Sequence, residues 1–341
     1  MPKQRLSKEG AILAGDVGGT KTILAYFDAK EIGRIAKQSR TFQNDKFSSF
    51  DELLAEFLKD ANERPQALSL GVAGPVSGGQ VQITNRPWSI DEEKLRTQFD
   101  LSEVFLLNDL KATAQAIPML QPSDLHFLHE GKPVPNGNIA VIAPGTGLGE
   151  AFLTNVKGSY YARASEGGHT DFAPQTEMQD DLLAYLRKKF DHVSYERICS
   201  GSGIPNIYDF LNDNGMAEEP AWLLHQLEKA KDPTAVIVEA ALDKEKESAI
   251  SQMTMKIFVE VLAAEAGNLA LKVGATAGVF IGGGITPRIM PLLQNGNFVE
   301  HFSSKGRYQT FLERIPIQVM LNTQAALLGA ADYGLRQIEK T

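Results

Sequence analysis

The chain has 341 residues, a formal net charge of −8 and one cysteine. This length predicts one large or two medium domains, and the negative charge argues against nucleic acid or an anionic membrane as partner, because either would need a basic patch. A single cysteine excludes an internal disulfide and indicates a reducing compartment. Because residues 1–10 lack a signal-peptide core and no apolar run could span a bilayer, we expect a soluble, cytoplasmic protein.

The first predicted element is a β-hairpin over residues 11–28, whose apolar strands flank a glycine pair at 18–19. A strand follows these glycines, whereas a helix would follow them in a Walker loop or a Rossmann fingerprint. The turn therefore suits another phosphate-binding design, in which backbone N–H groups form a nest for an anion. Asp16 could hold a hydrated Mg²⁺, and Thr20 and Thr22 could donate to phosphate oxygens. An ordinary hairpin without ligand is the alternative.

The next part of the chain alternates helices with strands. Residues 50–63 have helical spacing, 67–73 and 81–84 read as strands, and Asp91 is predicted to cap a short helix that runs to Phe99. Such alternation predicts an α/β sheet.

A short buried strand at 104–107 ends at Asn108 and Asp109, where an alanine-rich helix begins. This order places the Asp109 carboxylate at the carboxyl edge of a sheet, where open α/β sheets bind their ligands. The plain alternative is that one of the two residues only caps the helix. The glycine turns and a separate polar cluster favour a catalytic base instead.

The proline-rich stretch 118–137 is predicted to be a loop and a domain boundary. A second strand–turn–strand unit follows over 138–154, with Gly145, Thr146 and Gly147 in its turn. No helix follows these glycines, which argues against a dinucleotide site. Two such units predict two related domains, whose hairpins could hold a triphosphate from both sides.

The polar cluster lies at residues 164–171. Two glycines in it let the backbone approach a ligand closely, and the side chains of Glu166 and His169 could bind sugar hydroxyls with directional hydrogen bonds. A metal site suits this spacing poorly, and a purely structural polar turn remains open.

The third quarter of the chain is mainly helical. Helices are predicted over 179–190, from 204 to 211 and from 247 to 271, the last of them amphipathic. Cys199 is expected to be a buried small residue and not a nucleophile. Within the long helix, Gly267 is expected to allow close packing.

A third glycine turn follows a buried strand at residues 282–284, with a helix expected to begin at Thr286 and Pro287. Three adjacent glycines leave room for a flat ring, so adenosine is assigned there. The chain is predicted to end with a strand at 315–320 and a helix at 323–337.

Five of these motifs together resemble the bacterial glucokinase family, which belongs to the hexokinase, actin and heat-shock ATPase superfamily. They are Gly15-Asp-Val-Gly-Gly-Thr20, Leu107-Asn-Asp-Leu110, Gly145-Thr-Gly-Leu-Gly149, Ser165-Glu-Gly-Gly-His169 and Ile281-Gly-Gly-Gly284. The resemblance runs from about residue 12 to residue 337. It implies an α/β, two-lobed actin-like ATPase (ribonuclease H-like) fold, with a cleft between a small α/β domain and a larger α+β domain. The small domain would comprise 1–118 plus 321–341, and the large one 119–320.

The resemblance also implies roles for individual residues. Asp109 would be the general base. The residues that contact sugar hydroxyls would be Asn108, Asp109, Glu166, His169 and Glu196. Those that bind ATP would be Gly15, Asp16, Val17, Gly18, Gly19, Thr20, Thr146, Gly147, Gly283 and Gly284. ATP would carry Mg²⁺ with it, no resident metal is expected, and a homodimer is expected.

These roles imply ATP-dependent phosphorylation of glucose at the 6-hydroxyl, which gives glucose 6-phosphate and ADP. A kinase for another hexose or for an N-acetylhexosamine is one alternative, and a non-catalytic sugar or nucleotide sensor on the same scaffold is another. The cysteine-rich zinc motif of the related repressor and kinase family is absent, so neither a structural zinc nor a repressor role is expected. Lys21 and Glu150, charged residues beside the two hairpins, depart from the family's pattern, and their roles stay open.

Overall fold

The computed structural model describes residues 11–28, 36–61, 64–84, 86–295 and 297–339. The N-terminal segment, for which the sequence predicts no signal peptide, lies outside these ranges.

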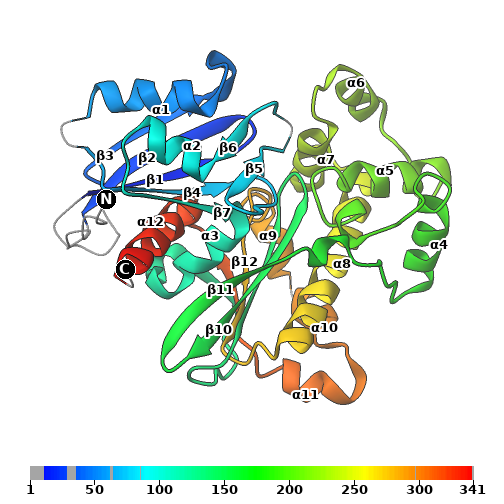
Figure 1. Cartoon of the computed structure of the whole chain (residues 1–341). Coiled ribbons are helices and arrows are strands. Elements are labelled where there is room, and N and C mark those ends of the chain that lie inside the picture. Colours follow the sequence, from blue (N-terminus) through cyan, green and yellow to red (C-terminus); the bar gives the residue numbers. More distant parts are fainter. Residues whose placement is uncertain (1–10, 29–35, 62–63, 85, 296, 340–341) are drawn as a thin grey trace. The chain divides into compact units, whose positions relative to one another are not determined.

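The chain divides into two compact units (Figure 1). Unit 1 comprises residues 1–121, 159–164 and 322–341, and unit 2 comprises 122–158 and 165–321. The domain limits expected from the sequence stay a prediction.

Unit 1 contains a five-stranded sheet with the order β3-β2-β1-β4-β7. Its strands, with the short β5–β6 pair, are β1 (Ala11–Val17), β2 (Lys21–Asp28), β3 (Gln38–Gln43), β4 (Ala67–Val72), β5 (Gln80–Gln82), β6 (Ser89–Asp91) and β7 (Glu103–Asn108). Strands β1 and β2 form the predicted antiparallel hairpin, whereas β1, β4 and β7 are parallel. The carboxyl ends of β1 and β7 therefore lie at one edge of the sheet.

Helices cover both faces of this sheet. They are α1 (Phe50–Lys59), α2 (Glu92–Gln98), α3 (Asp109–Ala116) and α12 (Ala325–Ile338). One buried cluster joins α1 and α2 to one face, and a second joins α3 and α12 to the other. Every residue of β4 is buried, as expected for a central parallel strand with helices on both sides. The predicted cap of α2 is confirmed, because the Asp91 side chain accepts from the Lys94 N–H.

Unit 2 is built on a sheet whose strands include the order β10-β9-β12-β13-β8. These strands are β8 (Leu125–His129), β9 (Ile139–Pro144), β10 (Leu148–Val156), β12 (Gly278–Ile281) and β13 (Ile317–Met320), while β11 (Ser159–Ser165) belongs mostly to unit 1. The helices are α4 (Glu177–Leu186), α5 (Ile204–Asp213), α6 (Ala221–Lys229), α7 (Pro233–Leu242), α8 (Ala249–Val273), α9 (Met290–Gln294), α10 (Asn297–Ser303) and α11 (Gln309–Leu312).

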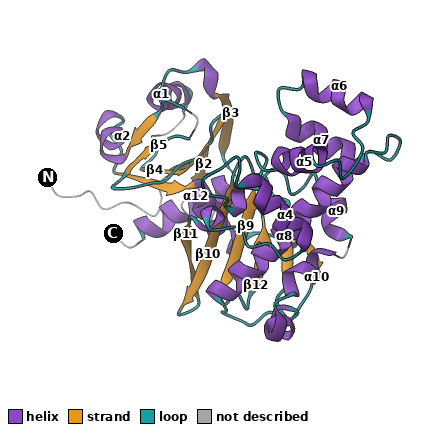
Figure 2. Cartoon of the chain, turned by 90° about the vertical axis from the view of Figure 1, so that its right-hand side faces the viewer, coloured by secondary structure: helices purple, strands orange, loops and turns teal. Residues whose placement is uncertain are grey.

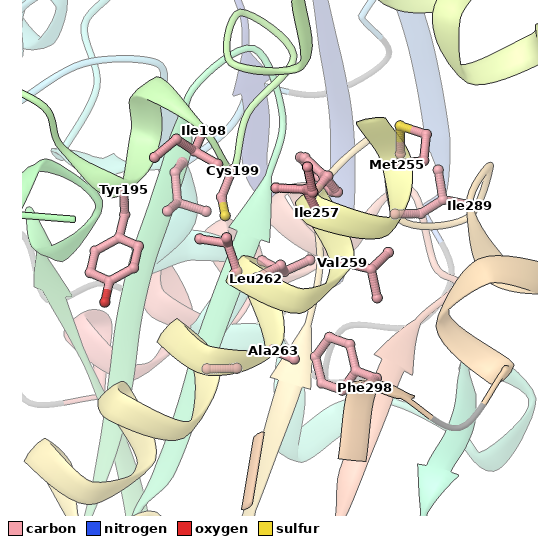
Figure 3. Close-up of a cluster of buried hydrophobic side chains, with 14 of the residues drawn as sticks. Tyr195, Ile198, Cys199, Met255, Ile257, Val259, Leu262, Ala263, Ile289 and Phe298 are labelled. Carbon is pink, nitrogen blue, oxygen red and sulfur yellow. The ribbon is translucent and has the colours of Figure 1, made fainter. Parts of the chain in front are cut away.

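The long helix α8 is the centre of the core of unit 2 (Figure 2). Figure 3 shows Ile198 and Cys199 in the same buried cluster as Leu262 of this helix. Cys199 is fully buried, which confirms its expected role as a core residue. At Gly267 a Cβ would lie 2.3 Å from the Phe302 carbonyl oxygen, so the expected close packing is confirmed as well.

Two sequence predictions in unit 2 are wrong. The stretch 118–137 is not only a loop, because β8 lies within it and pairs with β13. No helix begins at Thr286, since α9 begins at Met290 and the Thr286 hydroxyl instead donates to the Gly282 carbonyl. The partner of β8 is a strand far along the chain, which local composition does not reveal, whereas the Thr286 hydroxyl bonds to a carbonyl only four residues before it.

Among the described residues, no helix combines the length and hydropathy needed to cross a membrane.

Candidate functional site

The glycine turn of unit 1 is closed tightly and supported from behind. The Gly18 N–H donates to the Lys21 carbonyl at 3.0 Å. Asn44 Nδ2 donates to the Gly18 carbonyl at 2.8 Å, and Arg86 Nε donates to the Gly19 carbonyl at 2.6 Å. Sequence reasoning missed Asn44 and Arg86, because their contacts join the turn to segments more than 20 residues away. With the carbonyls held from behind, the turn is positioned to present N–H groups to an anion.

The residues of the motif at 15–20, and Thr22 just after it, differ in how accessible they are to a ligand. Gly15 and Val17 are buried in the sheet, and a Cβ at Gly15 would lie 2.5 Å from Leu70 Cδ2. Thr20 is exposed at the turn and can donate to a ligand, whereas Thr22 is fully buried. The Thr22 hydroxyl therefore cannot serve as the phosphate donor that the sequence suggested.

Asp16 lies near the end of β1, in a position where its charge is costly. Burial, and after it the charge of Asp109, raises the pKa of Asp16 from 3.8 to about 6, while the charge of Lys21 lowers it. Asp16 is thus ionised at neutral pH, and Lys21 helps to keep it so. This influence on Asp16 gives Lys21 an electrostatic role beside the turn.

The Asp16→Asn variant should be more stable than the wild type at pH 8. A raised folded-state pKa stabilises the fold fully below pH 3.8, and this contribution is lost as the pH rises through about 6. Asparagine stays neutral, so its advantage should grow from nearly zero near pH 4 to at most about 3 kcal/mol at pH 8, at about 1.4 kcal/mol for each pKa unit. Urea unfolding at both pH values measures the difference. An equal difference at the two pH values would contradict the assignment.

Asn108 and Asp109 lie at the junction of β7 and α3, and only the Asn108 side chain caps the helix. Asn108 is the N-cap, since its Oδ1 accepts from the Leu110 and Lys111 N–H groups at 3.0 and 3.2 Å. Asp109 is the first helical residue and is half-buried, and its Oδ1 accepts from the Leu110 N–H at 2.8 Å. With Asn108 as the cap, the Asp109 carboxylate is not needed to begin the helix.

In unit 2, β9 and β10 form the second predicted hairpin. The Gly145 N–H donates to the Gly147 carbonyl at 2.8 Å and closes the turn. Glu196 lies directly against it, because its Oε2 accepts from the Leu148 N–H at 2.9 Å. A Cβ at Gly147 would lie only 2.4 Å from the same oxygen. Glycine at this position therefore makes room for a carboxylate.

The polar cluster of unit 2 meets the same carboxylate. Glu166 and His169 are exposed around the short 3-10 turn Gly167–His169. His169 Nδ1 lies 3.8 Å from Glu196 Oε1. Glu196 thus joins the glycine hairpin to the hydroxyl-binding candidates. No group of three or more metal-ligating side chains occurs in the described ranges.

The third glycine turn lies at the end of β12, beside the end of β9. Gly283 has a positive φ of 85°, and a Cβ there would lie 2.2 Å from the Pro144 carbonyl oxygen, so only glycine is suitable. Gly284 is exposed, and a Cβ there would meet no described atom within 4 Å. With exposed Thr146 in the adjoining turn, this open surface suits the flat ring predicted from the sequence.

Comparison with known proteins gives consistent results. The sequence model of the family described as Glucokinase matches residues 13–337. The glucokinase of Nostoc punctiforme is 40% identical over 334 residues, which cover 94% of this chain and 97% of the relative. The crystal structure of a glucokinase from an Antarctic psychrotroph is 32% identical, with a TM-score of 0.82 and coverage of 96% and 99%. A ROK family glucokinase from Streptomyces griseus, in complex with glucose and AMPPNP, has a TM-score of 0.63 at 18% identity, with coverage of 96% and 100%.

Proposed function

The chain belongs to the glucokinase family, and from this premise we propose that it transfers the γ-phosphoryl group of ATP to the 6-hydroxyl of glucose. The actin-like ATPase fold expected from the sequence is the fold of these sugar kinases. The observation that carries the proposal is the position of Glu196. One carboxylate oxygen accepts from the backbone of the glycine hairpin, and the other lies beside His169. A phosphoryl donor and a sugar need adjoining sites of these two kinds.

Asp109 acts as the general base in this proposal. It accepts the proton of the 6-hydroxyl while the oxygen attacks the γ-phosphorus in line, which leaves ADP and glucose 6-phosphate. The transition state asks the protein mainly for positioning and for stabilisation of charge. Asn108, Glu166, His169 and Glu196 would orient the sugar hydroxyls. The phosphates and adenosine would contact Gly15, Asp16, Val17, Gly18, Gly19, Thr20, Thr146, Gly147, Gly283 and Gly284.

Mg²⁺ is proposed to arrive with the nucleotide. The donor set suits it, because Mg²⁺ in kinases takes one or two carboxylates and keeps waters and phosphate oxygens. Asp16 supplies such a carboxylate, ionised at pH 7, beside a second one at Asp109. When bound, the ion would neutralise charge on the phosphates.

A homodimer in the cytoplasm is proposed from the resemblance, and sedimentation equilibrium tests the oligomeric state.

A coupled assay for glucose 6-phosphate, with purified protein, MgATP and glucose, tests the reaction. Mannose and N-acetylhexosamines are assayed alongside. Fastest turnover of glucose supports the proposal. Preference for another sugar would replace the substrate, and ATP hydrolysis without sugar dependence would favour a sensor.

Variants Glu166→Gln and His169→Ala should raise the KM for glucose and leave the KM for ATP within about twofold. Glu166→Gln replaces a charged acceptor with a neutral amide, and His169→Ala removes a hydrogen bond to a sugar hydroxyl altogether. A single hydrogen bond contributes about 0.5–3 kcal/mol, or roughly 2- to 150-fold in affinity, with the larger values for charged partners. Asp171→Asn, an exposed carboxylate next to the same loop, is the matched control. Unchanged glucose affinity in both variants would remove these residues from the site.

A further inference from the structure

Glu150 is a buried ionisable residue of unit 2 that the proposed reaction does not use. It lies on β10, directly after Gly149, and is 2% exposed. Among the described residues its Oε1 has no hydrogen-bond partner. A buried polar atom without a partner costs free energy, so stability of the fold alone does not account for a carboxyl group here.

One side of Glu150 supports the loop at residues 165–169, which we call the sugar loop. A Cβ at Gly167 would lie 1.9 Å from Glu150 Oε2 and 2.7 Å from its Cδ. The backbone of the sugar loop therefore rests directly on this carboxyl group. Gly167 lies between Glu166 and His169, so a shift of the Glu150 side chain would move both candidate sugar ligands.

The other side of Glu150 faces Glu265, a fully buried residue of α8. The two carboxyl groups lie close enough for the charge of Glu265 to act on Glu150. Glu265 also accepts from Lys272 Nζ at 3.0 Å and from Asn268 Nδ2 at 2.8 Å. Each carboxylate oxygen of Glu265 thus has a hydrogen-bond donor.

The same hydrogen-bond network extends from Glu265 to the segment that carries Glu196, the other candidate sugar ligand of unit 2. Asn268 Nδ2 donates to the Tyr195 hydroxyl at 3.0 Å, and Tyr195 directly precedes Glu196. Figure 3 shows Tyr195 beside α8, in the buried cluster that includes Ala263. In addition, the Tyr195 N–H donates to the carbonyl of Thr170, next to the sugar loop, at 3.1 Å. The sugar loop and the Glu196 segment therefore share one buried support.

The charges in this support decide how it responds to pH. Two adjoining buried carboxyl groups cannot both ionise cheaply, and the Lys272 ammonium group is hydrogen-bonded to Glu265. Burial, and after it the charge of Glu265, raises the pKa of Glu150 to about 8, and Lys272 opposes this shift. Tyr195, Cys199 and Lys305 are further titratable groups that interact with the pair. At neutral pH, Glu150 can therefore donate its proton to Glu265 and hold the pair together.

We propose that Glu150 is a positioning residue for sugar binding, which holds the sugar loop against Glu265 and so aligns Glu166, His169 and Glu196; this inference rests on the proposed function. Loss of the proton from Glu150 would set two negative charges side by side and push its side chain toward Gly167. Sugar affinity should then fall above pH 8, while the phosphoryl-transfer step is less affected.

The test measures glucose binding by calorimetry without ATP, together with kcat and KM, from about pH 7 to about pH 9.5. In the wild type the Kd and KM for glucose should rise above pH 8, by at most about tenfold for each pH unit, because one proton is linked to binding. Glu150→Gln keeps the shape and a donor for Glu265, so its KM should stay near the wild-type value at pH 7 and should not rise. Glu150→Val removes the donor and should raise KM at every pH with little change in kcat.

Glu239→Gln, an exposed carboxylate on α7, is the matched control and should follow the wild-type profile. Circular dichroism is used to check that each variant is folded. An alkaline rise in KM that persists in Glu150→Gln would overturn the inference and leave the proposed function intact. A wild type that binds no glucose at any pH would overturn both, so the two failures are distinguishable.

Discussion

Replacing Asp109 with asparagine is expected to lower kcat for glucose phosphorylation by about 10²- to 10⁴-fold, the usual contribution of a general base. The amide has nearly the shape of the carboxylate but cannot accept the proton of the 6-hydroxyl. The KM for glucose should change by no more than about threefold, because the amide can still form a hydrogen bond with a hydroxyl. Steady-state kinetics by the coupled assay measures both constants.

The fold should survive this change. Asn108 supplies the N-cap of α3, so the helix does not depend on the Asp109 charge. Asp91→Asn is the matched control, because Asp91 stands at the N-terminus of α2 in the same unit and accepts from the Lys94 N–H at 2.8 Å. Asparagine caps helices as well as aspartate does, so this control should keep full activity. A kcat within about tenfold of the wild type in Asp109→Asn would reject the base assignment.

Asp109→Asn should also change a second observable. Burial is the largest cause of the raised pKa of Asp16, and the charge of Asp109 is the next. Without that charge the pKa of Asp16 should fall toward its ordinary value. Carboxyl NMR titration of Asp16 therefore tests the proximity of the two carboxylates independently of catalysis.

The second large effect is expected from Gly329→Ala in α12. A Cβ at this position would lie 1.7 Å from the carbonyl oxygen of Ala112 and 3.0 Å from the Ala116 nitrogen, both in the backbone of α3. Neither atom belongs to a side chain that could rotate away, so α3 and α12 must separate. We expect a loss of at least about 3 kcal/mol in the free energy of unfolding, at the upper end of overpacking costs. Denaturant titration measures it, and kcat should fall too, because α3 carries Asp109.

Gly334→Ala is the graded control, since it lies in the same helix and has the same gain of about 1 kcal/mol in helix propensity. Its Cβ would lie 2.9 Å from Ser69 Cβ, which the backbone of β4 holds in place, so a small shift is needed. Its cost should be about 1 to 2 kcal/mol, below that of Gly329→Ala, because the required shift is much smaller. Equal stability of the two variants would show that the contact between α3 and α12 is not the reason for glycine at 329.

The sequence by itself was sufficient for features that depend on neighbouring residues. The hairpins β1–β2 and β9–β10 follow from apolar runs around glycines, and both are confirmed. The same holds for the Asp91 cap, which a residue three positions away completes. Five motifs in order also identified the family, which the comparisons confirm.

Only the tertiary structure decided the features that depend on residues far apart in the chain. The sequence around Asn44 and Arg86 does not indicate that they support the turn at Gly18. Nor does the sequence indicate that Glu150 lies close to Glu265, 115 positions away. Hydrogen-bond geometry and burial, which set the pKa of a carboxyl group, arise when separate segments pack together. Local composition does not report that packing, and for this reason β8, which pairs with the distant β13, was predicted wrongly while the glycine hairpins were predicted correctly.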